Sequence, residues 1–200
     1  MVYLYTFDVS TLPDMDQCAE LIKQLPKARQ EKVEKCKKEE KARQSLGAGL
    51  LLEKVFKEHG ICTNDIRIGR HGKPEVDGLY FNLSHSGSMV ICAVSEKPVG
   101  CDVEQMRSAP RKIATHFFCK SEEEYLRKFD GESYDREFFR LWTIKESYIK
   151  MTGEGGSIPL DSFEVELEDG IRIRRDGVLQ ACVVKEYEMT GYQITACSGK

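Results

Sequence analysis

RLWTIKESYIKMTG, residues 140–153, carries the pattern on which the predicted fold and site depend. As a helix, it places Trp142, Glu146 and Lys150 four residues apart, so an aromatic ring, a carboxylate and an ammonium lie on successive turns of one face. Glu and Lys at this spacing also form an ordinary exposed pair, which stabilises a helix by about 0.3 kcal/mol. Spacing alone therefore does not distinguish an active-site face from a solvent-exposed one.

The composition limits the class of protein. The chain has 200 residues, 40% of them hydrophobic, which is enough for one large domain or two small ones with a buried core. Its net charge of −3 argues against a general nucleic-acid-binding protein. Residues 23–43 contain nine Lys or Arg and four Glu, a balance of +5, so the rest of the chain carries −8. This basic segment is either a solvated helix face or a surface for an anionic ligand.

The eight cysteines are scattered without a C-x-x-C pair, and several lie in apolar runs such as residues 89–94. This distribution is typical of buried free thiols in a reducing compartment, and not of a disulfide framework or a zinc ribbon. The first ten residues, MVYLYTFDVS, alternate like a strand and lack the basic leader and apolar core of a signal peptide. No apolar run has the length of a membrane span. We therefore expect a cytoplasmic protein without a membrane partner.

Helices are expected in the first third of the chain after one strand. Alternation of side chains predicts a strand over residues 2–9, and a short helix is expected over residues 14–25, where Pro26 stops it. Leucine, valine and phenylalanine then recur at helical spacing after the basic segment. This stripe predicts a long, partly buried helix over residues 39–59 that ends at Gly60.

Short strands and turns follow, and two of them carry polar residues. Lys73 precedes Pro74 in an extended, stiffened stretch, where its ammonium can meet a phosphate as a point charge. NLSHSG, residues 82–87, lies between two apolar strands and brings Ser84 and His85 to one strand end. Such a group of donors is typical of anion recognition, although a lone histidine is more often a satisfied turn residue.

VGCDVE, residues 99–104, predicts a strand with two carboxylates on one side. In a strand, Asp102 and Glu104 point together to one face and the alternate apolar residues point to the other. Because adjacent carboxylates repel each other, they either face water or share a hard cation. A site with oxygen ligands alone favours Mg²⁺ over zinc.

The remainder of the chain predicts a second long helix and more strands. The helix covers residues 134–151 and stops at Gly153, and before it Ser121 and Glu124 have the spacing of a capping box. Antiparallel strands are expected in FEVELEDGIRIRR, ACVVKEYE and YQITACSG.

The two halves of the chain share one organisation, although no residue-by-residue repeat is present. We expect an α+β fold of two similar subdomains, residues 1–98 and 99–200, each a long helix packed on a small antiparallel sheet. Two such subdomains form a cleft, where binding sites are common. Because both walls of this cleft lie in one chain, a monomer is expected.

Four ordered motifs resemble those of the 4′-phosphopantetheinyl transferases, specifically the double-length type that activates surfactin synthetase. They are GKP at 72–74, FNLSHSG at 81–87, VGCDVE at 99–104 and LWTIKESYIK at 141–150, with weaker likeness through PLDSF at 159–163 and GYQITAC at 191–197. Together they cover most of the chain, and four motifs in order are far more specific than any one of them.

This resemblance implies a pseudo-twofold α+β fold. It also implies transfer of the phosphopantetheine group of coenzyme A to a serine hydroxyl of an apo acyl or peptidyl carrier protein, with release of 3′,5′-ADP. Asp102, Glu104 and Glu146 would bind Mg²⁺. Glu146 would also act as base toward the serine, directly or through a water, and Lys150 would neutralise charge on the bridging phosphate. Trp142 is expected to be a packing residue.

The resemblance also assigns residues to coenzyme A, which is a substrate here. They are Arg29, Lys32, Arg43, Gln44, Lys73, Ser84 and His85. His85 would contact a phosphate, with Ser84 and Lys73 close to the nucleotide, while Arg43 and Gln44 match positions near the adenine. An overall acidic protein needs such cations, and a metal, to hold the several negative charges of coenzyme A.

The basic segment fits the family pattern less closely. Arg29 and Lys32 keep the spacing of two phosphate-binding cations if one residue is inserted before Arg43. The family often has an acidic residue shortly before that position, where this chain has Lys41 and Ala42.

Two rival functions fit part of the same pattern. Three carboxylates and a lysine also suit a magnesium phosphohydrolase, in which water replaces serine as the attacking group. A coenzyme A or carrier-protein binding module without activity is the other rival. The intact set of Asp102, Glu104, Glu146 and Lys150 argues against a module that has lost its activity.

Overall fold

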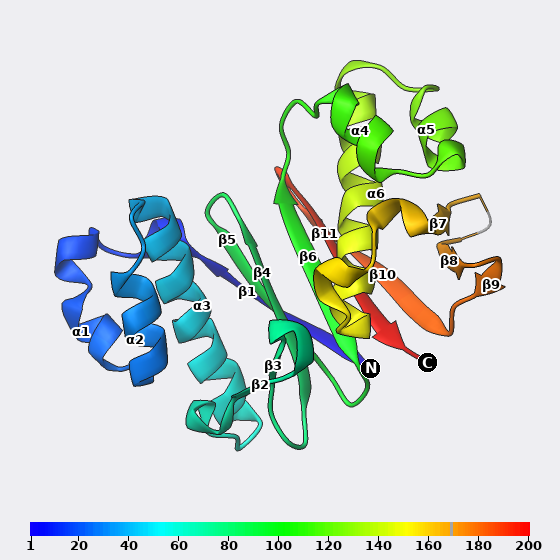
Figure 1. Cartoon of the computed structure of the whole chain (residues 1–200). Helices are drawn as coiled ribbons and strands as arrows, with labels where there is room; N and C mark the ends of the chain where they lie inside the picture. The colour runs from blue at the N-terminus through cyan, green and yellow to red at the C-terminus, as the bar shows by residue number, and fades with distance from the viewer. Residues whose placement is uncertain (169) are drawn as a thin grey trace.

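Two long helices and two three-stranded antiparallel sheets form the centre of the computed structural model, which describes residues 1–168 and 170–200 (Figure 1). The first sheet has the order β1 (Val2–Asp8), β5 (Met89–Ser95), β4 (Tyr80–Ser86). The second has the order β10 (Cys182–Met189), β11 (Tyr192–Gly199), β6 (Val99–Gln105). The predicted α+β class with small antiparallel sheets is therefore confirmed, whereas the pseudo-twofold relation and the boundary at residue 98 stay predictions.

The first long helix, α3 (Glu39–Glu58), packs on the first sheet. Its apolar stripe lies against β1 and the alternate side chains of β5, so the predicted helix is confirmed to within one residue. Two shorter helices, α1 (Ala19–Lys23) and α2 (Lys27–Glu34), lie beyond α3. The helix predicted over residues 14–25 is shorter than expected, because the chain turns at the buried Cys18 between a 3₁₀ turn and α1.

The second long helix, α6 (Gly131–Thr152), packs on β6 and β11 and ends at Gly153, as predicted. Gly153 has a φ of 74°, the left-handed conformation that commonly ends helices. Trp142 stacks on Phe138 with ring centroids 5.9 Å apart and meets the edges of two further phenylalanines. The packing role expected for Trp142 is confirmed.

Smaller elements surround this centre. The short pair β2 (Arg67–Ile68) and β3 (Pro74–Glu75) follows α3, and α4 (Arg111–Phe117) and α5 (Lys120–Leu126) precede α6. A third sheet follows α6 and has the order β7 (Phe163–Glu166), β8 (Arg172–Arg175), β9 (Val178–Leu179).

The capping box predicted for Ser121 and Glu124 is wrong. Helix α5 starts earlier, and Glu122 Oε2 accepts a hydrogen bond of 3.0 Å from the N–H of Cys119, the residue that caps it. Ser121 instead donates its hydroxyl to Glu164 on β7. The carboxylate that returns to the cap thus belongs to a residue two positions earlier than expected.

The two sheets are joined by an apolar layer and by a line of polar side chains. The layer consists of Met89, Ile91, Ala93, Val99, Cys101, Val103, Ile194 and Ala196. Alternate side chains of β4 accept the outward N–H groups of β6, in the pairs Cys101 to Asn82 (2.9 Å), Val103 to Ser84 (3.4 Å) and Gln105 to Ser86 (3.1 Å). Side chains of β4 therefore serve as the hydrogen-bond acceptors for β6 that backbone carbonyls would provide in an ordinary neighbouring strand.

The cysteine prediction is partly confirmed. In the described part of the chain all eight thiols are free, and four of them are buried, namely Cys18, Cys92, Cys101 and Cys197. Cys62 is exposed, contrary to expectation. Among the described helices, none combines the length and the apolar character that crossing a membrane requires.

Candidate functional site

Strand β6 and helix α6 approach each other unusually closely at Gly100. A Cβ atom at this position would lie 2.1 Å from the carbonyl oxygen of Ser147 and 2.3 Å from the backbone nitrogen of Met151. Only glycine allows this approach. It brings the carboxylate face of β6 against the turn of α6 that carries Lys150.

Asp102 lies at the centre of this contact and is almost fully buried, with 4% of its surface exposed. Its Oδ1 accepts hydrogen bonds from Lys150 Nζ at 2.6 Å and from the Ser84 hydroxyl at 2.8 Å. Its Oδ2 is buried and has no hydrogen-bond partner among the described residues. A buried carboxylate oxygen without a partner is costly, so this atom is a candidate ligand for a cation.

Glu104 and Glu146 lie on the same side and interact electrostatically with Asp102. Burial raises the pKa of Glu104, although a hydrogen bond of 2.9 Å from Ser86 opposes this, and the charge of Asp102 raises it further. Burial also raises the pKa of Glu146, where Lys150 acts in the opposite direction and both other carboxylates add to the rise. The structure thus brings together the three predicted metal ligands as one repelling group.

These carboxylates have the oxygen donors that Mg²⁺ prefers. In the arrangement shown by the described residues, however, no three Asp, Glu, His or Cys side chains are close enough together to hold a metal ion. One Asp102 oxygen is occupied by Lys150, which takes the place that a cation would otherwise fill. The donor chemistry fits a magnesium ion, whereas the spacing requires the side chains to move.

Lys150 is the cation of this group. Burial opposes its charge, but the ion pair and hydrogen bond with Asp102 outweigh that effect and raise the pKa of Lys150. Its ammonium is also 3.1 Å from the Ser84 hydroxyl. Ser84 is therefore buried between Asp102 and Lys150, and its predicted place beside the nucleotide stays a prediction.

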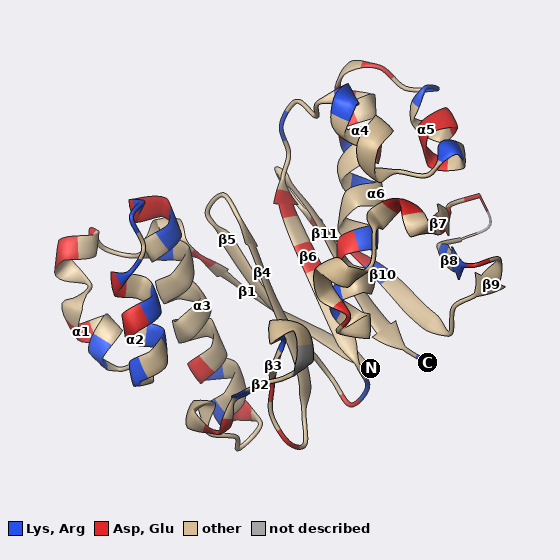
Figure 2. Ribbon diagram, viewed as in Figure 1, with Lys and Arg blue, Asp and Glu red and all other residues tan. Residues whose placement is uncertain are grey.

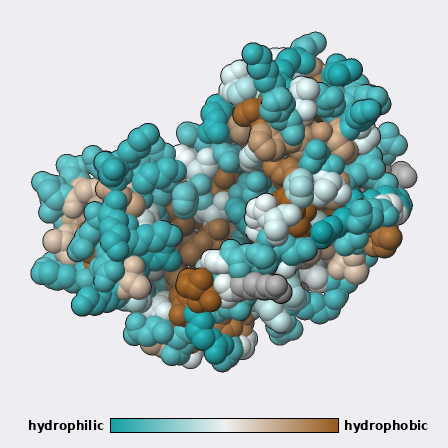
Figure 3. Space-filling view, viewed as in Figure 1, coloured by the Kyte–Doolittle hydropathy of each residue, from teal (hydrophilic) through white to brown (hydrophobic). Residues whose placement is uncertain are grey.

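His85 follows on the same strand and is exposed. The surrounding protein still removes part of the water around its imidazole, which lowers the pKa of the ring, and the charges of Lys41, Lys150 and Lys32 lower that pKa further, in that order. Because the lysines come from α3, α6 and α2, the ring lies where positive charges from three helices converge. The surface is hollowed between the part with α1–α3 and the part with α4–α6 (Figure 3). Basic residues lie along α2 on one side and acidic residues on β6 on the other (Figure 2).

Arg29 and Lys32 line a cavity of about 470 Å³ next to α2. Burial lowers the pKa of both side chains, and the charge of Arg29 lowers that of Lys32 further. Gly72 and Pro74 from the GKP motif line the same cavity, together with apolar residues such as Ile68. The structure therefore brings the two predicted phosphate-binding cations together at one cavity that also has apolar walls.

Three other predicted coenzyme A residues are engaged with the protein itself. The Arg43 guanidinium donates to the carbonyls of Val9, Leu12 and Pro13 at 2.7 to 2.9 Å. Gln44 is 1% exposed. Their assignment to the adenine end stays a prediction, and the contacts shown here shape the protein around that position.

Lys73 also bonds to backbone rather than projecting freely. Its ammonium donates to the carbonyls of Val99 at 3.0 Å and of Lys150 at 2.5 Å, and burial lowers its pKa. The GKP motif is thereby tied to the end of α6. The side chain still lines a cavity of about 600 Å³ with Gly153 and Pro74, so its place next to a nucleotide stays a prediction.

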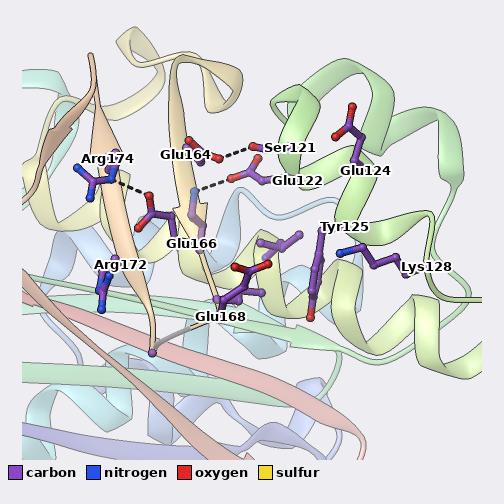
Figure 4. A pocket seen from close by; sticks show the side chains of 14 residues that line it. Ser121, Glu122, Glu124, Tyr125, Lys128, Glu164, Glu166, Glu168, Arg172 and Arg174 are labelled. Carbon is purple, nitrogen blue, oxygen red and sulfur yellow. Dashed lines mark hydrogen bonds and ion pairs between the residues drawn. The ribbon is translucent and has the colours of Figure 1, made fainter.

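A different cavity of about 600 Å³ lies between α5 and the β7–β8 hairpin (Figure 4). Charged side chains line it, including Glu166 with its partner Arg174 at 2.6 Å. In the described structure its walls include none of the predicted site residues. We therefore do not assign the transfer chemistry to this cavity.

Lys41 and Lys145 are the charged residues that sequence reasoning left outside the site. Lys41 contributes more than any other charge to the low pKa of His85. Lys145, next to Glu146 in the chain, is fully buried in an ion pair of 2.7 Å with Glu122. Lys41 lies three residues before Gln44, a helical spacing that could have predicted the contact between their side chains. Nothing in the sequence pairs Lys145 with Glu122.

Comparisons with known proteins identify the family of this chain. Residues 98–197 match the family model described as the 4′-phosphopantetheinyl transferase superfamily. The chain is 38% identical to 4′-phosphopantetheinyl transferase Sfp of Bacillus subtilis over 84% of this chain and 80% of that protein. It is 37% identical to 4′-phosphopantetheinyl transferase gsp of Aneurinibacillus migulanus, over 78% and 68% of the two chains. The solved structure of Thermotoga maritima holo-[acyl-carrier-protein] synthase aligns at 17% identity with a TM-score of 0.44, over 52% of this chain and 62% of that one. The family match covers half of the chain and the relatives cover most of it, so the chain belongs to the 4′-phosphopantetheinyl transferase superfamily.

Proposed function

We propose that this transferase works with Mg²⁺ at a reaction centre formed by Asp102, Glu104, Glu146 and Lys150. The function is transfer of the 4′-phosphopantetheine group from coenzyme A to a serine hydroxyl of an apo acyl or peptidyl carrier protein, with release of 3′,5′-ADP. The observation that carries the proposed centre is the convergence of β6 and α6, which brings Lys150 within 2.6 Å of Asp102 beside two further carboxylates.

Asp102, Glu104 and Glu146 would hold the metal. Support comes from the buried Asp102 oxygen without a partner among the described residues, and from the charge of Asp102, which raises the pKa of both Glu104 and Glu146. When bound, Mg²⁺ supplies positive charge to the pyrophosphate of coenzyme A. Lys150, which is paired with Asp102 in this structure, would serve as the cation toward the phosphate.

The protein groups then have separate tasks in the transfer. A bond forms between the serine oxygen and the phosphorus atom, while the phosphorus–oxygen bond to 3′,5′-ADP breaks. Glu146 accepts the serine proton directly or through a water, a step that contributes about 10²-fold or more. Lys150 neutralises charge on the bridging phosphate and on the departing ADP.

The nucleotide part of coenzyme A would lie along the first half of the chain. Arg29 and Lys32 would bind phosphate at their shared cavity, and His85 would contact phosphate at the edge of β4. Ser84 and Lys73 would lie beside the nucleotide, held by the contacts described above. Arg43 and Gln44 would shape its adenine end from inside the protein.

The remaining proposals concern the setting of the reaction. We propose that the protein acts as a monomer in the cytoplasm on a carrier protein of nonribosomal peptide or fatty acid biosynthesis. A panel of apo carriers from both kinds of pathway, each incubated with coenzyme A and Mg²⁺, would identify the partner. Carriers that gain the phosphopantetheine mass are substrates.

Metal dependence is tested by comparing Asp102→Ala with the wild-type protein over a magnesium titration after chelation with EDTA. We expect wild-type transfer to require the added ion and the variant to lose most activity at every concentration. Glu188→Ala, which removes an exposed carboxylate on β10, is the matched control and should behave like wild type. Unchanged magnesium dependence in Asp102→Ala would contradict a metal-binding role for Asp102.

A further inference from the structure

Lys41 is an exposed lysine in the first turn of α3, and its ammonium is held in a defined place. Lys41 Nζ donates a hydrogen bond of 3.0 Å to Gln44 Oε1. The amide nitrogen of Gln44 donates in turn to the carbonyl of Gly87 at 2.8 Å and to Glu40 at 3.2 Å. Gln44 thus ties the Lys41 ammonium to the turn that follows His85.

The Lys41 ammonium forms no ion pair with Glu39 or Glu40, the two carboxylates in the same turn of α3. Glu40 bonds to the Gln44 amide, and Glu39 lies 3.7 Å from the Arg43 guanidinium. No ion pair between residues of the described ranges includes Lys41, whereas Lys150 across the cleft is neutralised by Asp102. The Lys41 ammonium is therefore held by a neutral amide oxygen and not by a carboxylate, which leaves it able to bind an anion.

The hydrogen bonds of Gln44 connect Lys41 to Gly87, two residues after His85. Among the lysine charges that lower the pKa of the His85 ring, that of Lys41 has the largest effect. Cations that converge from several elements repel one another unless a multiply charged anion lies between them. Lysine is well suited to such an anion because its ammonium is a point charge with three donors.

We propose that Lys41 binds a phosphate group of coenzyme A, and that Gln44 contributes by holding the Lys41 ammonium rather than by touching the nucleotide. The burial of Gln44, with 1% of its surface exposed and both ends of its amide occupied, supports the second part. This inference rests on the proposed function, since it assumes that coenzyme A occupies the cleft. Lys41 is then a phosphate-binding residue in addition to Arg29 and Lys32.

The test compares Lys41→Met with wild type in steady-state transfer to an apo carrier, with coenzyme A varied. We expect the KM for coenzyme A to rise about tenfold with little change in kcat, as for loss of one charge-assisted hydrogen bond. Lys57→Met, at the exposed far end of the same helix, is the matched control and should leave KM unchanged. An unchanged KM in an active Lys41→Met protein would overturn the proposal.

Dephospho-coenzyme A, which lacks the 3′-phosphate, separates the two phosphate positions. A rise in KM with coenzyme A alone assigns Lys41 to the 3′-phosphate, and a rise with both substrates assigns it to the pyrophosphate. Either result supports phosphate binding by Lys41. If wild type itself leaves the carrier unmodified, the proposed function fails, whereas an active wild type with an unaffected Lys41→Met refutes only this inference.

A double-mutant cycle tests the role of Gln44. Gln44→Leu should raise the KM for coenzyme A in the wild-type background and have little further effect in Lys41→Met, because the same contact is already lost. Thermal unfolding of each variant identifies any loss of folded protein. Fully additive effects on KM in folded variants would show that Gln44 acts independently of Lys41, and would overturn this part of the proposal.

Discussion

At the scale of single residues, the site depends on Gly100 as much as on the charged groups. Strand alternation correctly predicted that Asp102 and Glu104 share a face, and helical spacing put Glu146 and Lys150 on one side of α6. The sequence could not show that a missing side chain at Gly100 lets the two faces meet. The ion pair between Lys150 and Asp102 follows from that approach and was therefore not predictable from either segment alone.

Gly100→Ala should damage both stability and activity. The added methyl group would overlap backbone atoms of Ser147 and Met151, which cannot rotate away as a side chain would. We expect a loss of about 1–3 kcal/mol in the free energy of unfolding and a large fall in transfer rate, measured by denaturant unfolding and by carrier modification. Gly156→Ala is the matched control, because a Cβ there meets no atom within 4 Å. Equal behaviour of the two variants would contradict the close approach described here.

His85 should make coenzyme A binding depend on pH. Its pKa lies below the ordinary value of 6.5, so the ring is neutral near neutral pH and gains a positive charge only as pH falls through that lowered value. Added positive charge favours binding of phosphate, so affinity relative to His85→Gln should rise in this acidic window. Calorimetric titration with coenzyme A at several pH values gives the ratio of the affinities of wild type and His85→Gln. Because protonation of the ligand's own phosphate, near pH ~6, affects both proteins equally, it cancels in this ratio. A ratio that stays constant with pH would exclude His85 from phosphate contact.

At the scale of elements, a buried ion pair fastens α5 and β7 to the catalytic helix. Lys145 Nζ bonds to Glu122 at 2.7 Å and to the carbonyls of Leu160 and Phe163. Glu122 also accepts from the backbone N–H of Val165 at 2.8 Å. The sequence did not predict this ion pair, because Glu122 and Lys145 lie 23 positions apart in the chain. The local pattern at Ser121 suggested only a capping box.

Lys145→Met should destabilise the protein by about 3–5 kcal/mol, because Glu122 is left as an uncompensated buried charge. The double variant Glu122→Leu/Lys145→Met should recover part of this loss, since it removes both charges together. Urea unfolding of the two single variants and the double variant gives the coupling energy. Additive losses would mean that the two side chains stabilise α5 and β7 separately.

At the scale of the whole molecule, the site exists because two halves of the chain meet. The α+β class, both long helices and the order of the motifs could be predicted from local patterns. The line of contacts from β4 to β6 could not, since it depends on the register between two strands that do not form a backbone ladder. Arg43 and Lys73 show the same limit. The family resemblance put Arg43 near the adenine, and the charge of Lys73 suggested a phosphate contact, whereas the bonds of both to backbone carbonyls depend on distant segments.

The central claim is that Glu146, within this joint site, serves transfer to a carrier serine. The most direct measurement is the mass of an apo carrier protein after incubation with coenzyme A, Mg²⁺ and either wild type or Glu146→Gln, with release of 3′,5′-ADP followed in parallel. We predict that wild type adds the phosphopantetheine group to the carrier and that the variant does so at least about 10²-fold more slowly. Full turnover by Glu146→Gln would contradict the mechanism, and release of ADP from an unmodified carrier would show that the protein is a hydrolase.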